Sequence, residues 1–238
     1  MGSEKVRLLI VDDEVDLCHS IASYFEIFGY ETITANGGQE ALDVLKKESV
    51  QLVITDVRMP KVSGVQLLEA IKAKDFHQPK VLVISGYADL PVEELYNKGA
   101  DGFFSKPFDS RGMLEAIRKA IVTLEELWKR PPSVEPEFEL GFDEKLPSPN
   151  IGFGRGGFAV VHGSEPWGTD DIVRFYLNLH DPDLPEVRGA GVVRWRKNGQ
   201  LGGKAISGIE ITFLDDACRS QFVQWLGKRA AAPYIPTL

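Results

Sequence analysis

Polar side chains follow four of the short apolar runs in the N-terminal half, each at the point where the run stops. They are Asp12 and Asp13 after residues 6–11, Asp56 after 51–55, Ser85 after 81–84 and Lys106 after 102–104. Carboxylates that are brought together repel one another, so positive charge is needed among them. Mg²⁺ suits one or two carboxylates with water and phosphate oxygens, and a lysine adds a fixed positive charge. With a hydroxyl donor, these groups form a cradle for a phosphoryl group that a carboxylate oxygen can attack in line.

The elements that must position these side chains alternate between strands and helices. We expect strands at 6–11, 31–34, 51–55, 81–84 and 102–104, and helices at 14–28, 39–45, 63–74, 91–98 and 110–129. This alternation predicts an α/β fold, a doubly wound five-stranded parallel sheet of the flavodoxin-like kind with helices on both faces. Sites in such sheets form outside the carboxyl ends of the strands, which is where the polar residues stand.

The composition is typical of an ordinary globular protein of one to two domains. The chain has 238 residues, of which 43% are hydrophobic and 26% charged, and its net charge is -8. That charge disfavours general attraction to nucleic acid or anionic lipid. The apolar runs fall far short of the roughly 20 residues of a membrane span, and no signal segment is recognisable, so we expect a cytoplasmic protein. Cys18 and Cys218 are expected to be small buried hydrophobic side chains.

Residues 5–128 resemble the receiver domain of two-component response regulators. The resemblance rests on the segments 11–14, 55–60, 85–86 and 105–108. It implies that Asp56 accepts phosphate from a histidine kinase or a phosphotransfer protein. It implies further that Ser85 and Lys106 contact the phosphoryl oxygens and that Mg²⁺ is held by four groups: Asp12, Asp13, Asp56 and the carbonyl of Arg58.

Three other positions have roles that the resemblance implies. Phe103 occupies the family's aromatic switch position, and an ordinary core position is the alternative interpretation. Arg58 and Tyr87 occupy positions that tune the lifetime of the phosphate, in a direction that the sequence leaves open.

The predicted helix 110–129 has apolar residues spaced three and four apart. We expect Leu114, Ile117 and Ile121 to pack on the sheet. Leu124 and Trp128 lie beyond the expected end of the sheet, and two alternatives stay open: they pack on a second domain, or they pair two chains. A homodimer through residues 91–98, 102–104 and 110–129 is the corresponding hypothesis for assembly.

Paired prolines at 131 and 132 indicate a linker over 129–136, between a first domain at 1–128 and a second at 137–238. Alternation at 138–142 and strands at 158–161, 172–179, 189–196 and 208–213 predict a small all-β barrel, closed by a helix at 216–229. Residues 152–157 match the pattern GxGxxG. We reject a dinucleotide site, because this stretch opens a strand and not a helix, and we predict a tight glycine turn.

The second half resembles a PilZ domain, a family of cyclic di-GMP receptors, in segments 154–160, 191–195, 208–214 and the final helix. Of the family's ligand motifs, only Arg130 and Gly157 remain, because Val134 and two glycines replace the other ligand residues. Arg155, with Arg194 and Arg196, is the candidate for another binding mode. Since arginine recognises both phosphate and guanine, we expect weak or absent binding in the usual mode.

The first functional hypothesis is therefore a phosphorylation-switched response regulator whose PilZ-like domain contacts an unidentified output protein. The alternative is an effector that reads both phosphate and cyclic di-GMP. A transcription factor ranks last, because no helix-turn-helix or basic stripe is evident, and apart from cyclic di-GMP we expect no nucleic-acid ligand. We expect no independent enzyme, because His162 and His180 have no evident partners in the sequence.

Overall fold

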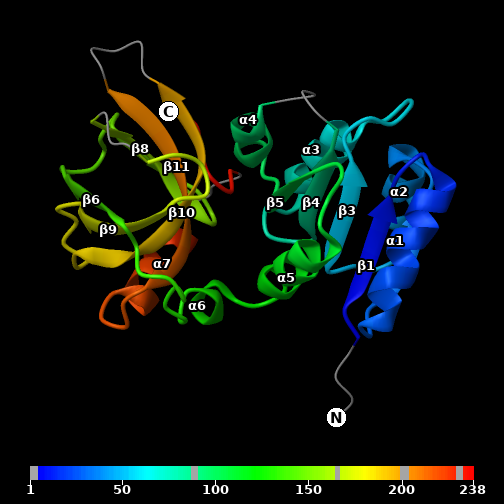
Figure 1. Cartoon of the computed structure of the whole chain (residues 1–238), viewed down its shortest axis with the longest axis horizontal. Helices are drawn as coiled ribbons and strands as arrows, with labels where there is room; N and C mark the ends of the chain where they lie inside the picture. The colour runs from blue at the N-terminus through cyan, green and yellow to red at the C-terminus, as the bar shows by residue number, and fades with distance from the viewer. Residues whose placement is uncertain (1–4, 87–90, 164–166, 199–203, 229–232) are drawn as a thin grey trace. The chain divides into compact units, whose positions relative to one another are not determined.

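The computed structural model describes residues 5–86, 91–163, 167–198, 204–228 and 233–238 (Figure 1). Contacts divide the chain into two compact units. The first unit comprises Met1–Pro91 and Lys98–Ile121, and the second comprises Val92–Asn97 and Val122–Leu238. Each unit is built around a sheet of its own.

The first unit contains a five-stranded parallel sheet in the order β2-β1-β3-β4-β5. Its strands are β1 (Arg7–Val11), β2 (Glu31–Ala35), β3 (Leu52–Asp56), β4 (Lys80–Ser85) and β5 (Gly102–Ser105). Its helices are α1 (Val15–Ile27), α2 (Gly38–Val44), α3 (Gly64–Lys74) and α5 (Ser110–Ala120), and helix α4 (Val92–Asn97) groups with the second unit. The strand order reverses between β1 and β3, which confirms the predicted doubly wound fold.

Strand residues alternate between the two faces of this sheet, and helices cover both faces (Figure 1). Leu8 and Ile10 of β1 share one core with Phe25 of α1 and Ile117 of α5. Cys18 lies in this core and Cys218 is buried in the second unit, as the sequence predicted, and both are free thiols.

The predicted helix 110–129 is wrong, because the structure has two helices there. Helix α5 ends at Ala120, and α6 (Leu124–Leu127) begins after Thr123, whose hydroxyl accepts a hydrogen bond from the amide of Glu126 at 3.3 Å. A β-branched run ending in a strong capping residue thus starts a new helix. Ile121 is 37% exposed, so it does not complete the predicted apolar face, whereas Trp128 is fully buried in the core of the second unit.

The second unit contains a six-stranded curled β half-barrel in the order β6-β9-β10-β11-β8-β7. The strands are β6 (Phe138–Asp143), β7 (Ile151–Phe153), β8 (Gly157–His162), β9 (Ile172–Asn178), β10 (Val187–Asn198) and β11 (Ala205–Leu214). Neighbours are antiparallel except β6 and β9, which pair in parallel. Helix α7 (Arg219–Gly227) closes the core with Phe222 and Trp225. Strand β7, which the sequence did not predict, has only three residues.

Strands β7 and β8 form a hairpin that is connected by residues 154–156, and we call the stretch 152–157 around this connection the glycine turn. The amide of Gly154 donates to the carbonyl of Gly157 at 2.8 Å. The predicted glycine turn between strands is therefore confirmed.

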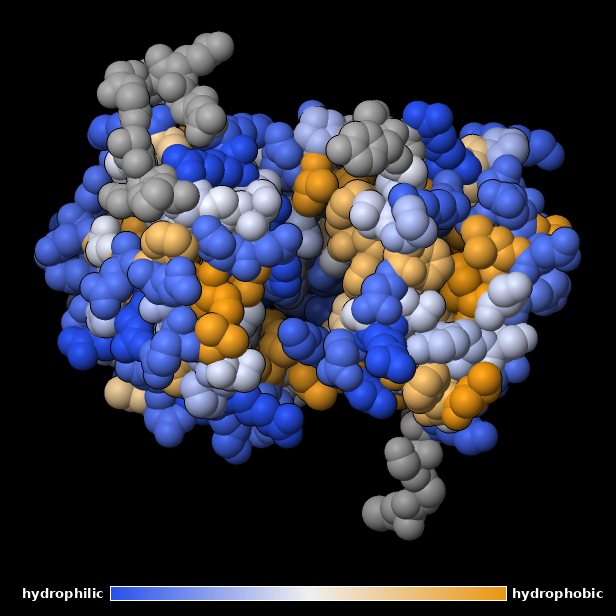
Figure 2. Space-filling model, in the orientation of Figure 1, coloured by the Kyte–Doolittle hydropathy of each residue, from blue (hydrophilic) through white to orange (hydrophobic). Residues whose placement is uncertain are grey.

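The face drawn in Figure 2 is mostly hydrophilic, with apolar residues in smaller groups. Ile27 and Phe28 at the end of α1 are among the exposed large apolar residues. Across the described residues, every helix is too short or too polar to span a bilayer.

Candidate functional site

Two buried carboxylates lie side by side at the carboxyl ends of the central strands. Asp56 is the last residue of β3 and is 6% exposed, and Asp12 directly follows β1 and is 2% exposed. The pairing of Val11 with Thr55 puts the two strand ends next to each other. The predicted convergence of strand ends therefore holds for this pair, at the point where the strand order reverses.

Lys106, one residue beyond β5, lies between these two carboxylates. Its Nζ is 2.5 Å from Oδ1 of Asp56 and 3.2 Å from Oδ2 of Asp12. Its backbone amide donates to the carbonyl of Ser85 at 2.7 Å, which fixes where the side chain starts. Burial alone would lower the pKa of Lys106, but the hydrogen bond to Asp56 and the charge of Asp12 raise it above the ordinary value. The lysine therefore stays charged at neutral pH.

The backbone orients both carboxylates. The amide of Arg58 donates to Oδ2 of Asp56 at 2.6 Å, and the amide of Glu14 donates to Oδ1 of Asp12 at 2.9 Å. In Asp56, Oδ1 therefore faces the lysine while Oδ2 faces the loop after β3.

Gly64 is a positioning residue for the site that sequence reasoning did not identify. A Cβ at Gly64 would lie 1.9 Å from the carbonyl oxygen of Asp56, and the amide of Gly64 donates to Val57 at 3.0 Å. Helix α3 can approach the end of β3 only because this residue has no side chain. The available signal was a glycine immediately after Ser63, which caps α3 in a capping box with Gln66.

The other predicted site residues differ in burial. Ser85 ends β4 and is buried, with its hydroxyl donating to the carbonyl of Gly86 at 2.9 Å. Asp13 and the side chain of Arg58 are exposed, and Phe103 in β5 is half-buried. Tyr87 lies outside the described residues.

The donor set at this edge fits Mg²⁺ better than a softer metal. Among the described residues, no three His, Cys, Asp or Glu side chains form a metal-holding group. Asp12 and Asp56 nevertheless supply two oxygen ligands, and Mg²⁺ is commonly bound by one or two carboxylates with waters and phosphate oxygens.

In the second unit, most of the arginines that the sequence analysis named as candidates for binding a nucleotide contact other residues of the protein. Arg130 is exposed after α6. Arg155 is 6% exposed, with its guanidinium 5.7 Å from the centre of the Tyr234 ring. Arg194 bonds Glu210 at 2.6 Å and Asp170 at 3.1 Å.

The other two candidates for cyclic di-GMP also serve the half-barrel itself. Gly157 packs against the backbone of β11, where a Cβ would lie 2.0 Å from the carbonyl oxygen of Ile209. Arg196 bonds the carbonyl of Trp167. These contacts describe internal packing and do not assemble an anion site.

The expectation that the two histidines of the second half lack partners is wrong. His162 Nε2 lies 2.8 Å from the hydroxyl of Ser207, and His180 contacts Asp143. Ser207 is 1% exposed and His162 is 8% exposed, so this pair is buried in the half-barrel. The long sequence separation of each pair explains why sequence reasoning missed them.

A cavity of about 300 Å³ lies in the second unit between the residues before β6 and the outer face of β9 and β10. Arg174 and Arg188 line it, but each is ion-paired at 2.7 Å, with Glu135 and Glu186 respectively. Asp215 adds a further carboxylate to the lining, so the cavity has mixed charge.

Two buried carboxylates thus meet one lysine at the reversal point of a parallel sheet, where folds of this class form their binding sites. Residues 8–118 match the family model of the response regulator receiver domain. Sporulation initiation phosphotransferase F of Bacillus subtilis is 32% identical over 114 residues, which are 48% of this chain and 91% of that protein. The chain therefore belongs to the response regulator receiver family. This membership implies phosphorylation-dependent two-component signalling, a histidine kinase as partner and Mg²⁺ for phosphorylation.

Two further relatives match over a smaller share of their length. The transcriptional regulatory protein CpxR homolog of Haemophilus influenzae is 35% identical over 112 residues, and the response regulator SaeR of Staphylococcus aureus is 29% identical over 138. The chain spans 48% and 58% of these two relatives. A receiver domain protein from Clostridium thermocellum is 34% identical, with a TM-score of 0.46 over 49% of this chain and 94% of that one.

Proposed function

We propose that this protein is a phosphorylation-switched response regulator of a two-component phosphorelay. Asp56 accepts phosphate from a histidine kinase or phosphotransfer protein, and the second unit, a PilZ-like output domain, changes its protein contacts in response. The observation that carries this proposal is the convergence of buried Asp12 and Asp56 on Lys106. We further propose a cytoplasmic switch, not a metabolic enzyme.

The geometry assigns each group a task in the transfer. The amide of Arg58 holds Oδ2 of Asp56, which leaves Oδ1 to attack phosphorus in line. The phosphorus–nitrogen bond of the donor's phosphohistidine breaks, and the imidazole nitrogen leaves with the bonding electrons. Lys106 contacts Oδ1 of Asp56 in this structure. After the transfer its ammonium group would contact the negatively charged phosphoryl oxygens. Mg²⁺, held by Asp12 and Asp56 with the exposed Asp13 and the Arg58 carbonyl nearby in sequence, would neutralise charge on those oxygens.

The test is direct phosphorylation of the purified chain with acetyl phosphate and Mg²⁺, followed by intact-mass measurement. We expect one hydroxylamine-labile phosphoryl group on the wild type and none on Asp56→Ala. We expect Lys106→Met to be modified at least about tenfold more slowly, because each tenfold corresponds to roughly 1.4 kcal/mol of transition-state stabilisation. Asp43→Ala removes an exposed carboxylate of α2 and should behave as the wild type. A labile adduct that survives in Asp56→Ala would refute the assignment.

The output half of the proposal needs its own experiment. Affinity capture with Asp56→Glu and Asp56→Ala proteins should recover different amounts of the same partner, because only one of them carries a charge at the switch. Equal capture by both variants would show that the contact with the output partner does not depend on the charge at position 56.

We propose no nucleotide ligand for the second unit. Arg155 is buried against Tyr234, and Arg194 is saturated by two carboxylates. Since Arg130 alone of these candidates is exposed, the described residues do not gather the several arginines that a ligand with two phosphates and two guanines would need. Calorimetry with micromolar cyclic di-GMP should give no saturable signal.

A further inference from the structure

The segment 233–238 lies across the glycine turn of the half-barrel. The amide of Arg155 donates to the carbonyl of Pro233, and the amide of Gly156 donates to the carbonyl of Tyr234, both at 2.9 Å. Two successive donors of the turn thus hold two successive carbonyls of the segment. Backbone recognition of this kind requires an extended chain but no particular side chain.

Gly154 and Gly156 of the turn are needed for this approach, and Gly152 leaves room for the end of the Leu238 side chain. A Cβ at Gly156 would lie 2.1 Å from the Tyr234 ring, and one at Gly154 would lie 2.5 Å from the Tyr234 carbonyl oxygen. A Cβ at Gly152 would lie 2.9 Å from the side chain of Leu238. None of the three has a positive φ, so close approach and not backbone conformation excludes a side chain here. The glycine pattern therefore forms a groove for the segment.

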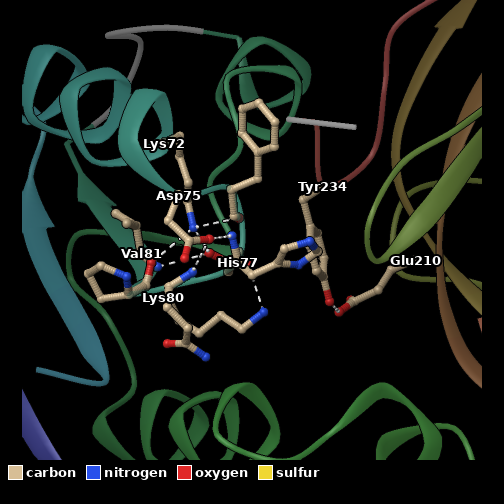
Figure 3. A network of polar contacts seen from close by, with 11 residues as sticks. Lys72, Asp75, His77, Lys80, Val81, Glu210 and Tyr234 are labelled. Carbon is tan, nitrogen blue, oxygen red and sulfur yellow. Dashed lines mark hydrogen bonds and ion pairs between the residues drawn. The ribbon is translucent and has the colours of Figure 1, made fainter. Parts of the chain in front are cut away.

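Two side chains of the segment anchor it in the groove. Ile235 is fully buried and Tyr234 nearly so, in a cluster with Ala159 and Trp195. The Tyr234 hydroxyl donates to Oε1 of Glu210 at 2.9 Å, as Figure 3 shows.

The groups that receive the tyrosine are themselves fixed. The other carboxylate oxygen of Glu210 accepts from Arg194 at 2.6 Å, and the guanidinium of Arg155 stands 5.7 Å from the centre of the ring. The groove thus selects an aromatic residue with a hydrogen-bond donor, followed by an aliphatic residue. The flanking Pro233 and Pro236 reduce the entropy lost when the segment becomes ordered.

We propose that the groove across the glycine turn is a docking site for an extended Pro-Tyr-aliphatic-Pro segment of a partner protein, and that residues 233–238 are its resident occupant. Besides these two carbonyls and two side chains, the amide of Tyr234 donates to the carbonyl of Tyr96 at 2.9 Å and the amide of Thr237 donates to Oδ1 of Asn97 at 3.2 Å. A segment of another chain with this chemistry meets the same groups. A resident segment has a high effective concentration, so the partner binds only when that segment is displaced. This site does not require phosphorylation of Asp56, and its failure would leave the receiver proposal intact.

The first test asks whether the glycine turn holds the segment in the full-length chain. Chymotrypsin cleavage after Tyr234, followed by intact mass, reports release of the segment. We expect Gly156→Ala to be cleaved at that bond at least about tenfold faster than the wild type, because the added methyl group displaces the ring. Gly141→Ala is the matched control, since its Cβ would meet no heavy atom within 4 Å. Cleavage of Gly156→Ala at the wild-type rate would overturn the proposal.

The second test asks whether the groove accepts the segment from outside. A chain ending at residue 232 should bind a fluorescent peptide of residues 233–238 saturably, and the full-length chain should bind it at least about tenfold more weakly. A peptide with alanine in place of the tyrosine should not bind. Equal binding by both chains, or none by a truncated chain that remains folded by circular dichroism, would overturn the proposal. If truncation unfolds the chain, full-length Tyr234→Ala replaces it: this variant should bind the peptide at least about tenfold more tightly than the wild type, and equal binding would overturn the proposal.

The same measurements with Asp56→Ala separate the two proposals. Peptide binding and chymotrypsin protection should be unchanged in this variant, although it takes no phosphate. A groove that fails in every chain while Asp56 is still phosphorylated would reject only the docking site.

Discussion

The first unit holds two lysine–aspartate sites at opposite ends of one parallel sheet. At the carboxyl ends, Lys106 is 28% exposed and faces two carboxylates. At the amino ends of β4 and β5, Lys72 and Asp101 are 3% and 2% exposed and pair at 2.8 Å. The first site has an excess of negative charge and access to solvent, and the second is nearly sealed.

The sealed site is also saturated with hydrogen bonds. Lys72 donates to the carbonyls of Pro79 at 3.0 Å and Phe76 at 3.3 Å, and Asp101 accepts from the amide of Val81 at 2.9 Å. Lys80 also contacts Asp101, at 3.5 Å, and Figure 3 draws Lys72 and Lys80 in this network of polar contacts. A charge pair in this state joins elements of the fold, whereas the open site keeps ligand positions for another molecule. The two sites contain the same residue types but differ in burial and in the balance of charge. These two properties therefore distinguish a structural ion pair from a site that can react with another molecule.

The largest expected effect is on the sealed pair. Lys72→Met leaves the buried carboxylate of Asp101 with only the longer contact to Lys80, and we expect a loss of about 3 kcal/mol in the free energy of unfolding. Urea denaturation followed by circular dichroism measures it. Lys80→Met should reduce the free energy of unfolding much less, because the contact of Lys80 with Asp101 is longer and Lys80 is partly exposed. The double variant Lys72→Met with Asp101→Leu should recover most of the loss, and a double variant as unstable as the single one would contradict this reasoning.

At the open site, removing a carboxylate should have a small effect on stability. Asp12→Asn leaves Lys106 paired with Asp56, so we expect a change below about 1 kcal/mol in the absence of Mg²⁺. Asp101→Asn is the matched variant at the sealed site and should destabilise strongly. The same denaturation measurement compares them, and equal losses would remove the distinction between the two sites.

The smallest effect is a dependence on alkaline pH. The folded state raises the pKa of Lys106, so its stabilising contribution is complete below the unfolded value of about 10.4 and is lost as pH rises through the folded value. The difference in unfolding free energy between wild type and Lys106→Met should therefore stay constant up to about pH 9.5. Above that pH the wild type should lose stability relative to the variant. If the wild type instead gained stability relative to the variant above that pH, the inferred direction of the pKa shift of Lys106 would be wrong.

The sequence predicts the first unit well because its signals are local. Apolar runs ending in Asp12, Asp56 and Lys106 define both the strands and the site. Lys72 resembles an ordinary exposed lysine of a helix, because its partner is 29 residues away. The approach of Gly64 to Asp56 is likewise a tertiary contact, which sequence indicates only as a glycine after a cap.

The second unit was harder to predict, since its contacts join distant segments. Strand β7 is too short to show a periodic pattern, and the role of Tyr234 depends on a turn almost 80 residues earlier, at Gly156. The break before α6 was missed because the apolar spacing continues through Thr123, although a capping residue was present there.

The place of Trp128 determines how this chain can be dissected. Its indole is fully buried in the half-barrel core, and its carbonyl accepts from the amide of Leu214 at 2.9 Å. A fragment cut at the prolines 131 and 132 would lose this side chain, and a missing buried tryptophan costs about 3–5 kcal/mol. An expression boundary that keeps the half-barrel whole should therefore precede Thr123, eight residues before the prolines that look like the natural place to cut.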